Sequence, residues 1–213
     1  MRAPGKKPLR LLVASSNQGK LGEYRALAEP AGASVDLAFI PDFDSLPVFE
    51  EIWPTFAENA VGKALHYSRF ADGLVIADDS GLVVPALGGA PGVHSARYAG
   101  PDASDADRIR KLLGEMGGKK KEERRAHFVC VVAVAESRKV RGLFSASAEG
   151  IILEEPRGRD GFGYDPIFFF PALGKTYAEI SRGEKNLHSH RGKAFHKALD
   201  FLLGLNARSA EKR

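Results

Sequence analysis

Short apolar runs alternate along the chain with segments in which apolar residues recur at helical spacing. Leu9–Ala14 has the length of a strand, and Leu21–Glu29 then shows apolar positions three and four residues apart. The alternation continues with an apolar run at Ala33–Ile40, a helix that opens at Thr55 and a strand that opens at Leu74. Strands and helices in this order predict an α/β fold built on a mixed sheet with flanking helices.

The second half of the chain predicts a β-hairpin and a long final helix. His127–Glu136 and Val140–Ala148 have the composition of strands and are separated by only three residues. An apolar stripe then predicts a last helix that ends near Leu205. We expect these elements to form a single domain over residues 9–206.

The ends of the chain carry its positive charge. The 213 residues have a net charge of +4, but residues 1–10 contribute four positive charges and residues 207–213 a further net two. The remainder is slightly negative, so we expect no dedicated nucleic-acid partner. We interpret residues 1–8 as a basic extension, expected to be disordered, and residues 207–213 as a tail.

Composition also bears on the cellular compartment. With Cys130 as the single cysteine, no internal disulfide can form, which is compatible with a reducing environment. No apolar run reaches membrane-spanning length, and the basic N-terminus is not followed by the apolar segment of a secretory signal. We expect a soluble cytoplasmic protein without a membrane partner.

Two adjacent acids mark the most informative stretch. The run that opens at Leu74 is expected to end at Asp78 and Asp79, which Ser80 and Gly81 follow. Ligands of α/β sheets lie beyond the carboxyl ends of strands, and carboxylates suit Mg²⁺. Neighbouring strand side chains point to opposite faces, so we expect the two acids to have different functions. The same residue types also form ordinary turns.

Two other segments have both a structural and a functional interpretation. Ser15–Lys20 lies between a strand and a helix, where backbone N–H groups and Lys20 could bind a phosphate, or where the residues could simply cap the helix. Thr55 and Glu58 match a capping box, whereas a functional Glu58 would be a metal ligand. Lys63, on the same predicted helix, could contact a phosphate.

The last third of the chain contains a glycine-rich loop and a basic segment. Three glycines interleave with Phe162 and Tyr164 in residues 158–166. Either aromatic ring could stack on a nucleobase, or both could fill a core beneath the loop. Residues 181–195 bring two histidines and several basic side chains to the start of the last helix. Such a group suits a polyanion or the edge of a base.

Taken together, these stretches resemble the inosine triphosphate pyrophosphatase family from Leu9 to about Leu203. Each motif is short, but all of them occur in the family's order. The motifs are Ser15–Lys20, Phe56-Ala57-Glu58-Asn59-Ala60, Ala77–Leu82, Gly88-Gly89-Ala90-Pro91-Gly92, Phe162–Asp165 and Ser189-His190-Arg191.

The resemblance implies a fold, a reaction and a set of site residues. The implied fold is a mixed sheet with flanking helices and two lobes around a central cleft, usually in a homodimer. The implied reaction is the Mg²⁺-dependent hydrolysis of ITP, dITP or XTP to the monophosphate and pyrophosphate. Asp79 would be the general base and a metal ligand, and Glu58 the second ligand. The implied substrate-binding residues are Ser15, Ser16, Asn17, Gln18, Gly19, Lys20, Ser80, Phe162, Gly163, Tyr164, Asp165, Lys185, His190 and Arg191.

Two other functions remain open from the sequence. A Maf-type nucleotide pyrophosphatase has a similar fold and a similar first loop, but lacks the Phe-Gly-Tyr-Asp and Ser-His-Arg stretches; it would prefer 7-methyl-GTP to ITP. A non-catalytic nucleotide-binding or nucleic-acid-binding protein would use the basic ends of the chain, and its binding would weaken with salt.

Overall fold

The computed structural model describes residues 8–211, with the side chains of residues 33 and 206–211 left aside. The predicted basic extension, apart from its last residue, therefore lies outside the described residues. The last helix, α5, spans His190–Glu211, so it includes residues 207–211 of the predicted tail.

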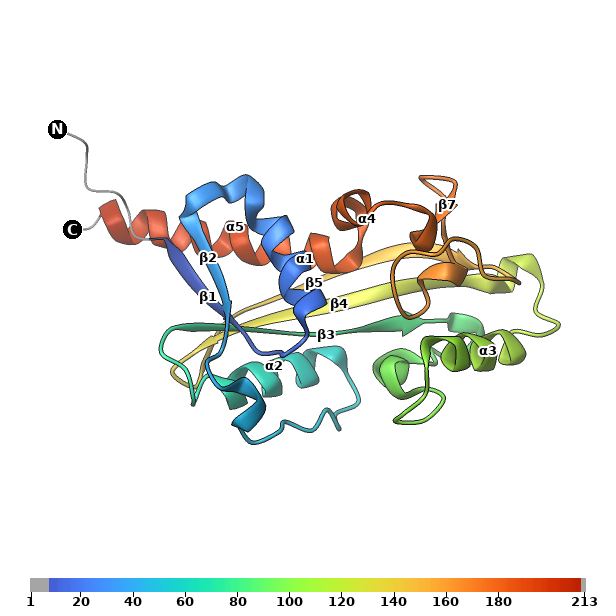
Figure 1. The fold of residues 1–213 in the computed structure, drawn as a ribbon, viewed down its shortest axis with the longest axis horizontal. Coiled ribbons are helices and arrows are strands. Elements are labelled where there is room, and N and C mark those ends of the chain that lie inside the picture. The colour runs from blue at the N-terminus through green and yellow to red at the C-terminus, as the bar shows by residue number, and fades with distance from the viewer. Residues whose placement is uncertain (1–7, 212–213) are drawn as a thin grey trace. The chain divides into compact units, whose positions relative to one another are not determined.

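One seven-stranded sheet carries the fold, in the order β2-β1-β3-β4-β5-β6-β7 (Figure 1). β1 pairs in parallel with both β2 and β3, whereas β6 is antiparallel to β5 and β7. The predicted mixed α/β fold is therefore confirmed. The strands are β1 Leu9–Val13, β2 Val35–Phe39, β3 Leu74–Val83, β4 Arg125–Glu136, β5 Lys139–Ile152, β6 Phe168–Phe170 and β7 Lys175–Thr176.

Five α-helices accompany the sheet within residues 8–211. They are α1 Gln18–Ala28, α2 Phe56–Tyr67, α3 Asp105–Glu115, α4 Arg182–His188 and α5 His190–Glu211. α2 begins at the predicted position, after Thr55, whose hydroxyl accepts a hydrogen bond from the N–H of Glu58 at 3.2 Å. Among the described helices, none has the length and apolar character needed to cross a membrane.

The chain divides into two compact units, which agrees with the expected two lobes. Unit 1 holds the chain up to Asp79, residues 131–145 and the chain from Gly192; unit 2 holds residues 80–130 and 146–191. β3, β4 and β5 each contribute residues to both units.

β3 differs from its prediction. The strand does not end at Asp78 and Asp79 but continues to Val83. Its parallel neighbour β1 is paired only as far as Val13 with Ile76, so the two acids lie beyond the carboxyl end of β1. On its other side β3 neighbours β4, a longer strand. Pairing with β4 thus keeps extended a segment whose residue types favour a turn.

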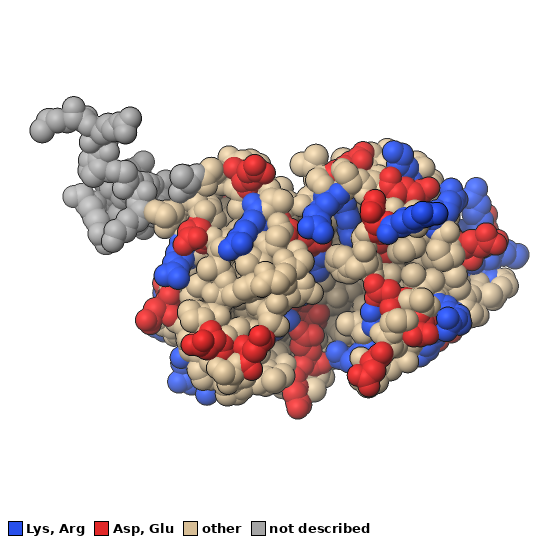
Figure 2. All heavy atoms as spheres, in the orientation of Figure 1, with Lys and Arg blue, Asp and Glu red and all other residues tan. Residues whose placement is uncertain are grey.

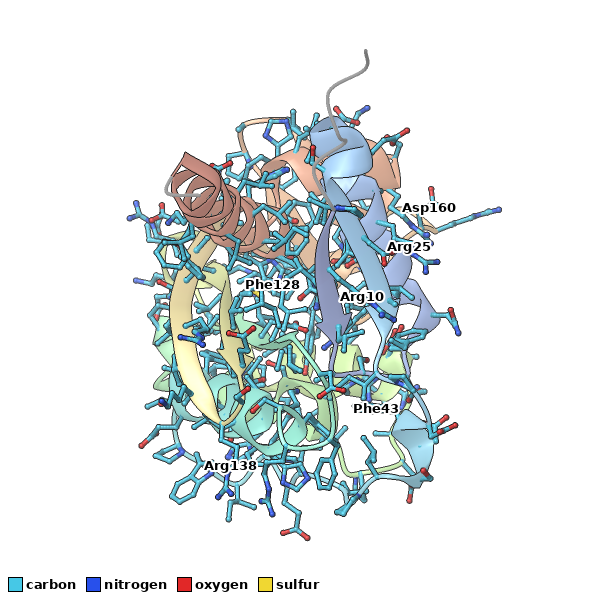
Figure 3. The ribbon with its side chains drawn as sticks, turned by 90° about the vertical axis from the view of Figure 1, so that its left-hand side faces the viewer. Arg10, Arg25, Phe43, Phe128, Arg138 and Asp160 are labelled. Atoms are coloured by element: carbon cyan, nitrogen blue, oxygen red, sulfur yellow. The ribbon has the colours of Figure 1, made fainter. Side chains whose placement is uncertain are left out.

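The core of unit 1 joins β1 to helices α1 and α5. The side chains of Leu11 and Val13 are buried, and the rings of Tyr24 and Phe195 pack with centroids 4.6 Å apart. Arg25 fastens α1 to β2, because its guanidinium donates two hydrogen bonds to the carbonyl of Leu37 (Figure 3). These contacts hold α1 against β2 and α5.

The core of unit 2 is rich in aromatic rings. Phe128 lies among packed side chains (Figure 3) and contacts Phe168 and Tyr177 at centroid distances of 4.6 and 6.0 Å. Leu112 and Met116, both buried, belong to the same core. This core supports the glycine-rich loop of residues 158–166.

Charged side chains of both signs are interspersed on the face drawn in Figure 2. No single-sign region dominates that face.

Two glycines give a test of the packing. A Cβ on Gly150 would lie 2.6 Å from the carbonyl oxygen of Phe169, whereas a Cβ on Gly114, exposed in α3, meets nothing within 4 Å. Gly150→Ala should lower the free energy of unfolding by about 1–3 kcal/mol through overpacking. Gly114→Ala should raise it by about 0.5–1 kcal/mol through helix propensity. Urea unfolding measures both, and equal effects would contradict the described contact between β5 and β6.

Candidate active site

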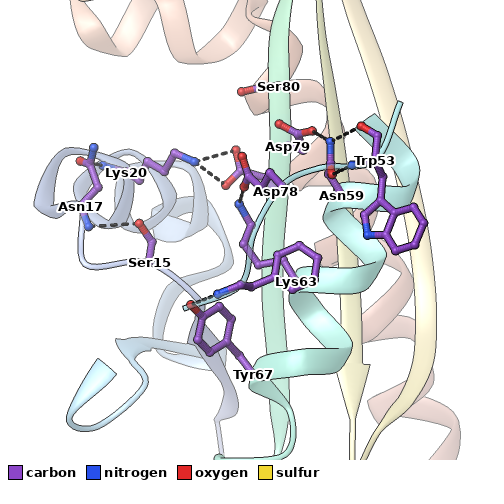
Figure 4. A network of polar contacts seen from close by, with 12 residues as sticks. Ser15, Asn17, Lys20, Trp53, Asn59, Lys63, Tyr67, Asp78, Asp79 and Ser80 are labelled. Carbon is purple, nitrogen blue, oxygen red and sulfur yellow. Dashed lines mark hydrogen bonds and ion pairs between the residues drawn. The ribbon is translucent and has the colours of Figure 1, made fainter. Parts of the chain in front are cut away.

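Asp78 and Asp79 are both buried in β3 and have different partners (Figure 4). The Nζ of Lys20 lies 3.1 and 3.3 Å from the two carboxylate oxygens of Asp78. The Oδ2 of Asp79 instead accepts a hydrogen bond from the Nδ2 of Asn59 at 3.0 Å. The two acids thus differ in their partners, as their alternation along the strand predicted.

The loop before α1 is a helix cap, and its side chains reach solvent. The Oδ1 of Asn17 accepts from the backbone N–H of Lys20 at 3.0 Å, and the N–H of Asn17 donates to the hydroxyl of Ser15 at 3.0 Å. The predicted cap is therefore confirmed. Ser16, Gln18 and Asn17 are exposed. The start of α1 thus combines a helix N-terminus with the ammonium of Lys20, a combination that suits an anion.

Lys63 brings a second ammonium to the acids of β3. Its Nζ forms an ion pair with Glu51, and its side chain is largely buried. Burial lowers the pKa of Lys63, but the charges of Glu51 and Asp78 outweigh that effect, and the net pKa is raised. Lys63 therefore stays protonated.

Asp79 has an elevated pKa. Burial and the nearby charge of Glu51 raise the pKa of Asp79 to about 6, although the hydrogen bond from Asn59 and the charge of Lys63 lower it. Within the described chain, Asp79 forms no ion pair. A carboxylate that titrates near neutral pH and has only a neutral hydrogen-bond partner is suited to accept a proton from water.

Glu58 takes part in the cap of α2. Its side chain is exposed and accepts a hydrogen bond from the hydroxyl of Thr55 at 2.7 Å, so it completes the cap of α2. The next residue, Asn59, makes the contact to Asp79. The role of Glu58 as a metal ligand stays a prediction.

The described residues offer a divalent cation few protein ligands. No group of three or more His, Cys, Asp or Glu side chains there is close enough to hold a metal ion. Mg²⁺ is commonly held by one or two carboxylates together with substrate phosphates and water. Asp79 and a neighbouring acid therefore fit a Mg²⁺ ion that arrives with a phosphate ligand.

Sequence reasoning did not identify Glu51 or Asn59 as site residues. Glu51 lies in a stretch with three prolines that reads only as a loop. Asn59 follows the more conspicuous Glu58 within the same motif. The single available signal was that motif's resemblance to the family.

In unit 2, a buried ion pair shapes the glycine-rich loop. The Nζ of Lys185 lies 2.5 Å from the Oδ2 of Asp165, and the same oxygen accepts from the N–H of Phe162 at 2.9 Å. Phe162 is 51% exposed, and the Nζ of Lys185 lies 4.4 Å from its ring centroid. Tyr164 is buried, and its hydroxyl donates to the carbonyl of Ser95. Only Tyr164 therefore fills the core.

The start of α5 joins the same part of unit 2. The Nη2 of Arg191 donates to the hydroxyl of Ser80 at 3.1 Å, and its guanidinium carbon lies 5.8 Å from the Phe162 ring centroid. The imidazole of His190 stacks on Phe128, with centroids 4.7 Å apart. Ser80, Phe162, Lys185 and Arg191 are thus brought together, and His190 packs on the core behind them.

The loop has a further anchor that the sequence did not reveal. The N–H of Gly163 donates to the Oδ2 of Asp105 at 2.6 Å, and Arg108 pairs with the same carboxylate. These interactions outweigh the effect of burial and lower the pKa of Asp105. Asp105 is therefore ionised at neutral pH, and its carboxylate binds the N–H of Gly163 in the loop.

The elevated pKa of Asp79 predicts how stability depends on pH. An acid whose pKa is raised by folding stabilises the fold at low pH, and this stabilisation is lost as the pH rises from about 4 through about 6. At pH 8 in EDTA, Asp79→Asn should therefore unfold with a free energy about 1–3 kcal/mol higher than the wild type. The gain should shrink toward pH 4.

Asp78→Asn is the matched control. It removes the carboxylate that pairs with Lys20, so it should give no gain at pH 8. Urea unfolding at both pH values measures the difference, and equal stabilisation by the two variants would contradict the described environment of Asp79.

The chain matches proteins of one family over most of its length. The sequence model of the Ham1 family matches residues 11–201. A dITP/XTP pyrophosphatase of Geobacillus kaustophilus is 50% identical over 187 residues, which cover 88% of this chain and 91% of that protein. A dITP/XTP pyrophosphatase of Gloeobacter violaceus is 48% identical, over 89% of this chain and 92% of that protein.

Solved structures agree with this result. The Ham1 protein of Staphylococcus aureus superposes with a TM-score of 0.81 at 39% identity, covering 92% of this chain and 98% of that one. A HAM1 protein from Coxiella burnetii gives the same TM-score at 41% identity, covering 92% and 99%. The resemblance drawn from the motifs is confirmed, and the chain belongs to the Ham1 family.

Proposed function

We propose that the protein hydrolyses deaminated purine nucleoside triphosphates, namely dITP, XTP and ITP, to the monophosphate and pyrophosphate. This would remove non-standard nucleotides from the cytoplasmic pool. The observation that carries the proposal is Asp79, a buried carboxylate with a pKa raised to about 6, which follows the Asp78–Lys20 ion pair in β3 and feels the charge of Lys63. The names of the relatives, dITP/XTP pyrophosphatases, supply the substrate class.

In this proposal the triphosphate binds at the start of α1. A nucleoside triphosphate carries about four negative charges, which must be offset before a water molecule can attack. The N–H groups after Asn17 and the ammonium of Lys20 would contact the phosphates, and Lys63 would add a second positive charge. Both lysines already have carboxylate partners, so they are held in place before the substrate arrives.

Mg²⁺ is the proposed cofactor. Once bound, it would neutralise phosphate charge and lower the pKa of a bound water. Asp79 is one proposed ligand. For the second, Glu58 is the expectation from the sequence, but Glu51 has more support because its charge acts directly on Asp79.

Asp79 would act as the general base. The oxygen of water forms a bond to the α-phosphorus, the bond from that phosphorus to the bridging oxygen breaks, and pyrophosphate leaves. The water proton passes to the carboxylate of Asp79. The neutral contact with Asn59 leaves this carboxylate free of a direct ion pair that would reduce its basicity.

The proposed base site is the group around Phe162. Its exposed ring could stack on a purine, which is worth about 1–3 kcal/mol. Hypoxanthine and xanthine present a carbonyl at position 6, which can accept a hydrogen bond from Arg191. Adenine presents an amino group there and would leave that donor unpaired, which can reduce turnover by about 10⁴–10⁵-fold.

We also propose, from the family resemblance, that the protein acts as a homodimer. Light scattering on the purified chain tests this.

Pyrophosphate release tests the proposed reaction. ITP, XTP, dITP, GTP, ATP and 7-methyl-GTP would be compared with Mg²⁺ and with EDTA. We expect turnover of ITP, dITP and XTP that requires the metal, and none by Asp79→Asn, because that variant lacks the base. Preference for 7-methyl-GTP would indicate the Maf-type activity instead. Absence of any turnover would contradict an enzymatic function.

Arg191→Ala tests recognition of the base. We expect KM for ITP to rise by about tenfold or more and the preference for ITP over ATP to narrow, because the donor to the 6-carbonyl is lost. Lys193→Ala is the control, since Lys193 is exposed on the same helix. An unchanged ITP-to-ATP ratio in Arg191→Ala would place base recognition on other residues.

A further inference from the structure

An extended segment of unit 1 runs along α2 and carries Glu51. We call residues 47–53 the strap. Its alternate residues contact α2, from His66 near the end of the helix for Pro47 to Asn59 near its start for Trp53, so the two run in opposite directions. The contacts join Pro47 to His66, Phe49 to Tyr67 and Gly62, Glu51 to Lys63, and Trp53 to Asn59.

Side chains between these contacts face solvent. Val48 is 81% exposed and Ile52 is 71% exposed, so burial of these two large apolar residues does not hold the strap. Individual anchors hold it instead. One is the ring of Phe49, which occupies the space beside Gly62 where a Cβ would come within 2.5 Å. Phe49 has two contacts, its ring beside Gly62 and its N–H to the hydroxyl of Tyr67, so loss of one leaves the other. Loss of Asn59 should instead loosen the strap at Trp53.

Asn59 is the anchor at the C-terminal end of the strap, and among the anchors in the described part of the chain it is the one that hydrogen-bonds to Asp79 (Figure 4). Its side chain is completely buried. The Oδ1 of Asn59 accepts from the N–H of Trp53 at 3.0 Å, and its Nδ2 donates to the carbonyl of Trp53 at 3.1 Å and to the Oδ2 of Asp79 at 3.0 Å.

This pattern requires a side-chain amide. The oxygen of a side-chain amide accepts from the peptide N–H, while its two N–H hydrogens donate to the peptide carbonyl and to the carboxylate. An aspartate of the same shape could accept from Trp53 but could donate to neither oxygen, and it would add a negative charge beside Asp79.

We propose that Asn59 is a positioning residue that fixes both the carboxylate of Asp79 and the strap that carries Glu51. The inference rests on the proposed function, because it assigns Asn59 a part in the same reaction. Misplacement of a reacting group by about 1 Å can cost about 10²-fold in rate. Substrate contacts at the start of α1 and in unit 2 do not involve Asn59, so its loss should affect kcat rather than KM.

Asn59→Ala and Asn59→Asp test this proposal, with Tyr67→Phe as the matched control. Tyr67→Phe removes the bond to the N–H of Phe49, in the N-terminal half of the strap, and leaves the contact between Asn59 and Asp79 in place. In saturating Mg²⁺ we expect both Asn59 variants to lose about 10²-fold in kcat for ITP, with KM within about threefold for Asn59→Ala. Tyr67→Phe should keep kcat within about threefold.

Fluorescence gives a readout that does not depend on activity. Trp53 is the single tryptophan of the chain, it lies in the strap and it is 48% exposed. Acrylamide should quench Trp53 more efficiently in Asn59→Ala than in the wild type, because both hydrogen bonds to its backbone are lost. Thermal unfolding would verify that each variant is folded. If Asn59→Ala fails to fold, the kcat of Asn59→Asp tests the proposal instead, because an aspartate keeps the shape of the side chain and the bond from the N–H of Trp53.

Three results would overturn the proposal: a folded Asn59 variant with kcat near the wild type, an equal loss of kcat in Tyr67→Phe, or unchanged quenching of Trp53. Failure of the proposed function looks different. In that case the wild type releases no pyrophosphate, while the quenching comparison still decides whether Asn59 anchors the strap.

Discussion

The burial of charge around Asp79 is the constraint on which the rest of unit 1 depends. Carboxylates removed from water are costly unless cations or hydrogen bonds compensate them. Lys20 pairs with Asp78 and Lys63 pairs with Glu51, whereas Asp79 accepts a hydrogen bond from the neutral amide of Asn59 and feels the charge of Lys63 without pairing with it. Because the negative charge of Asp79 is incompletely compensated, its pKa is raised. A cation that binds together with a phosphate would compensate this charge.

The need to compensate buried charge explains the positions of α1 and α2 and the length of β3. α1 must begin where β1 ends so that Lys20 reaches Asp78, and α2 must present Asn59 and Lys63 on one side. The strap then needs no core of its own, because α2 supplies its anchors. β3 must remain extended through its two acids, which its neighbour β4 makes possible.

Unit 2 also buries charged side chains, but it compensates their charge in a different way. The buried pair of Asp165 and Lys185 is matched in charge, and the spare capacity of the carboxylate holds the N–H of Phe162. Asp105 holds the next N–H, that of Gly163. The loop is therefore fixed while the ring of Phe162 stays exposed. A rigid aromatic surface flanked by cations is suited to a flat, polar ligand such as a purine.

The sequence by itself determined the α/β class, the hairpin, the start of α2 and the family, because periodicity, capping residues and ordered motifs are local properties. It also predicted that Asp78 and Asp79 would have different partners, since alternation is intrinsic to a strand. Only the tertiary structure decided which partners those are. The sequence singled out Glu58 through its local motif, whereas the hydrogen bond from Asn59 to Asp79 and the effect of the Glu51 charge on Asp79 arise between segments far apart in the chain. The extension of β3 past its acids likewise depended on β4, and no local pattern encodes pairing with a distant strand.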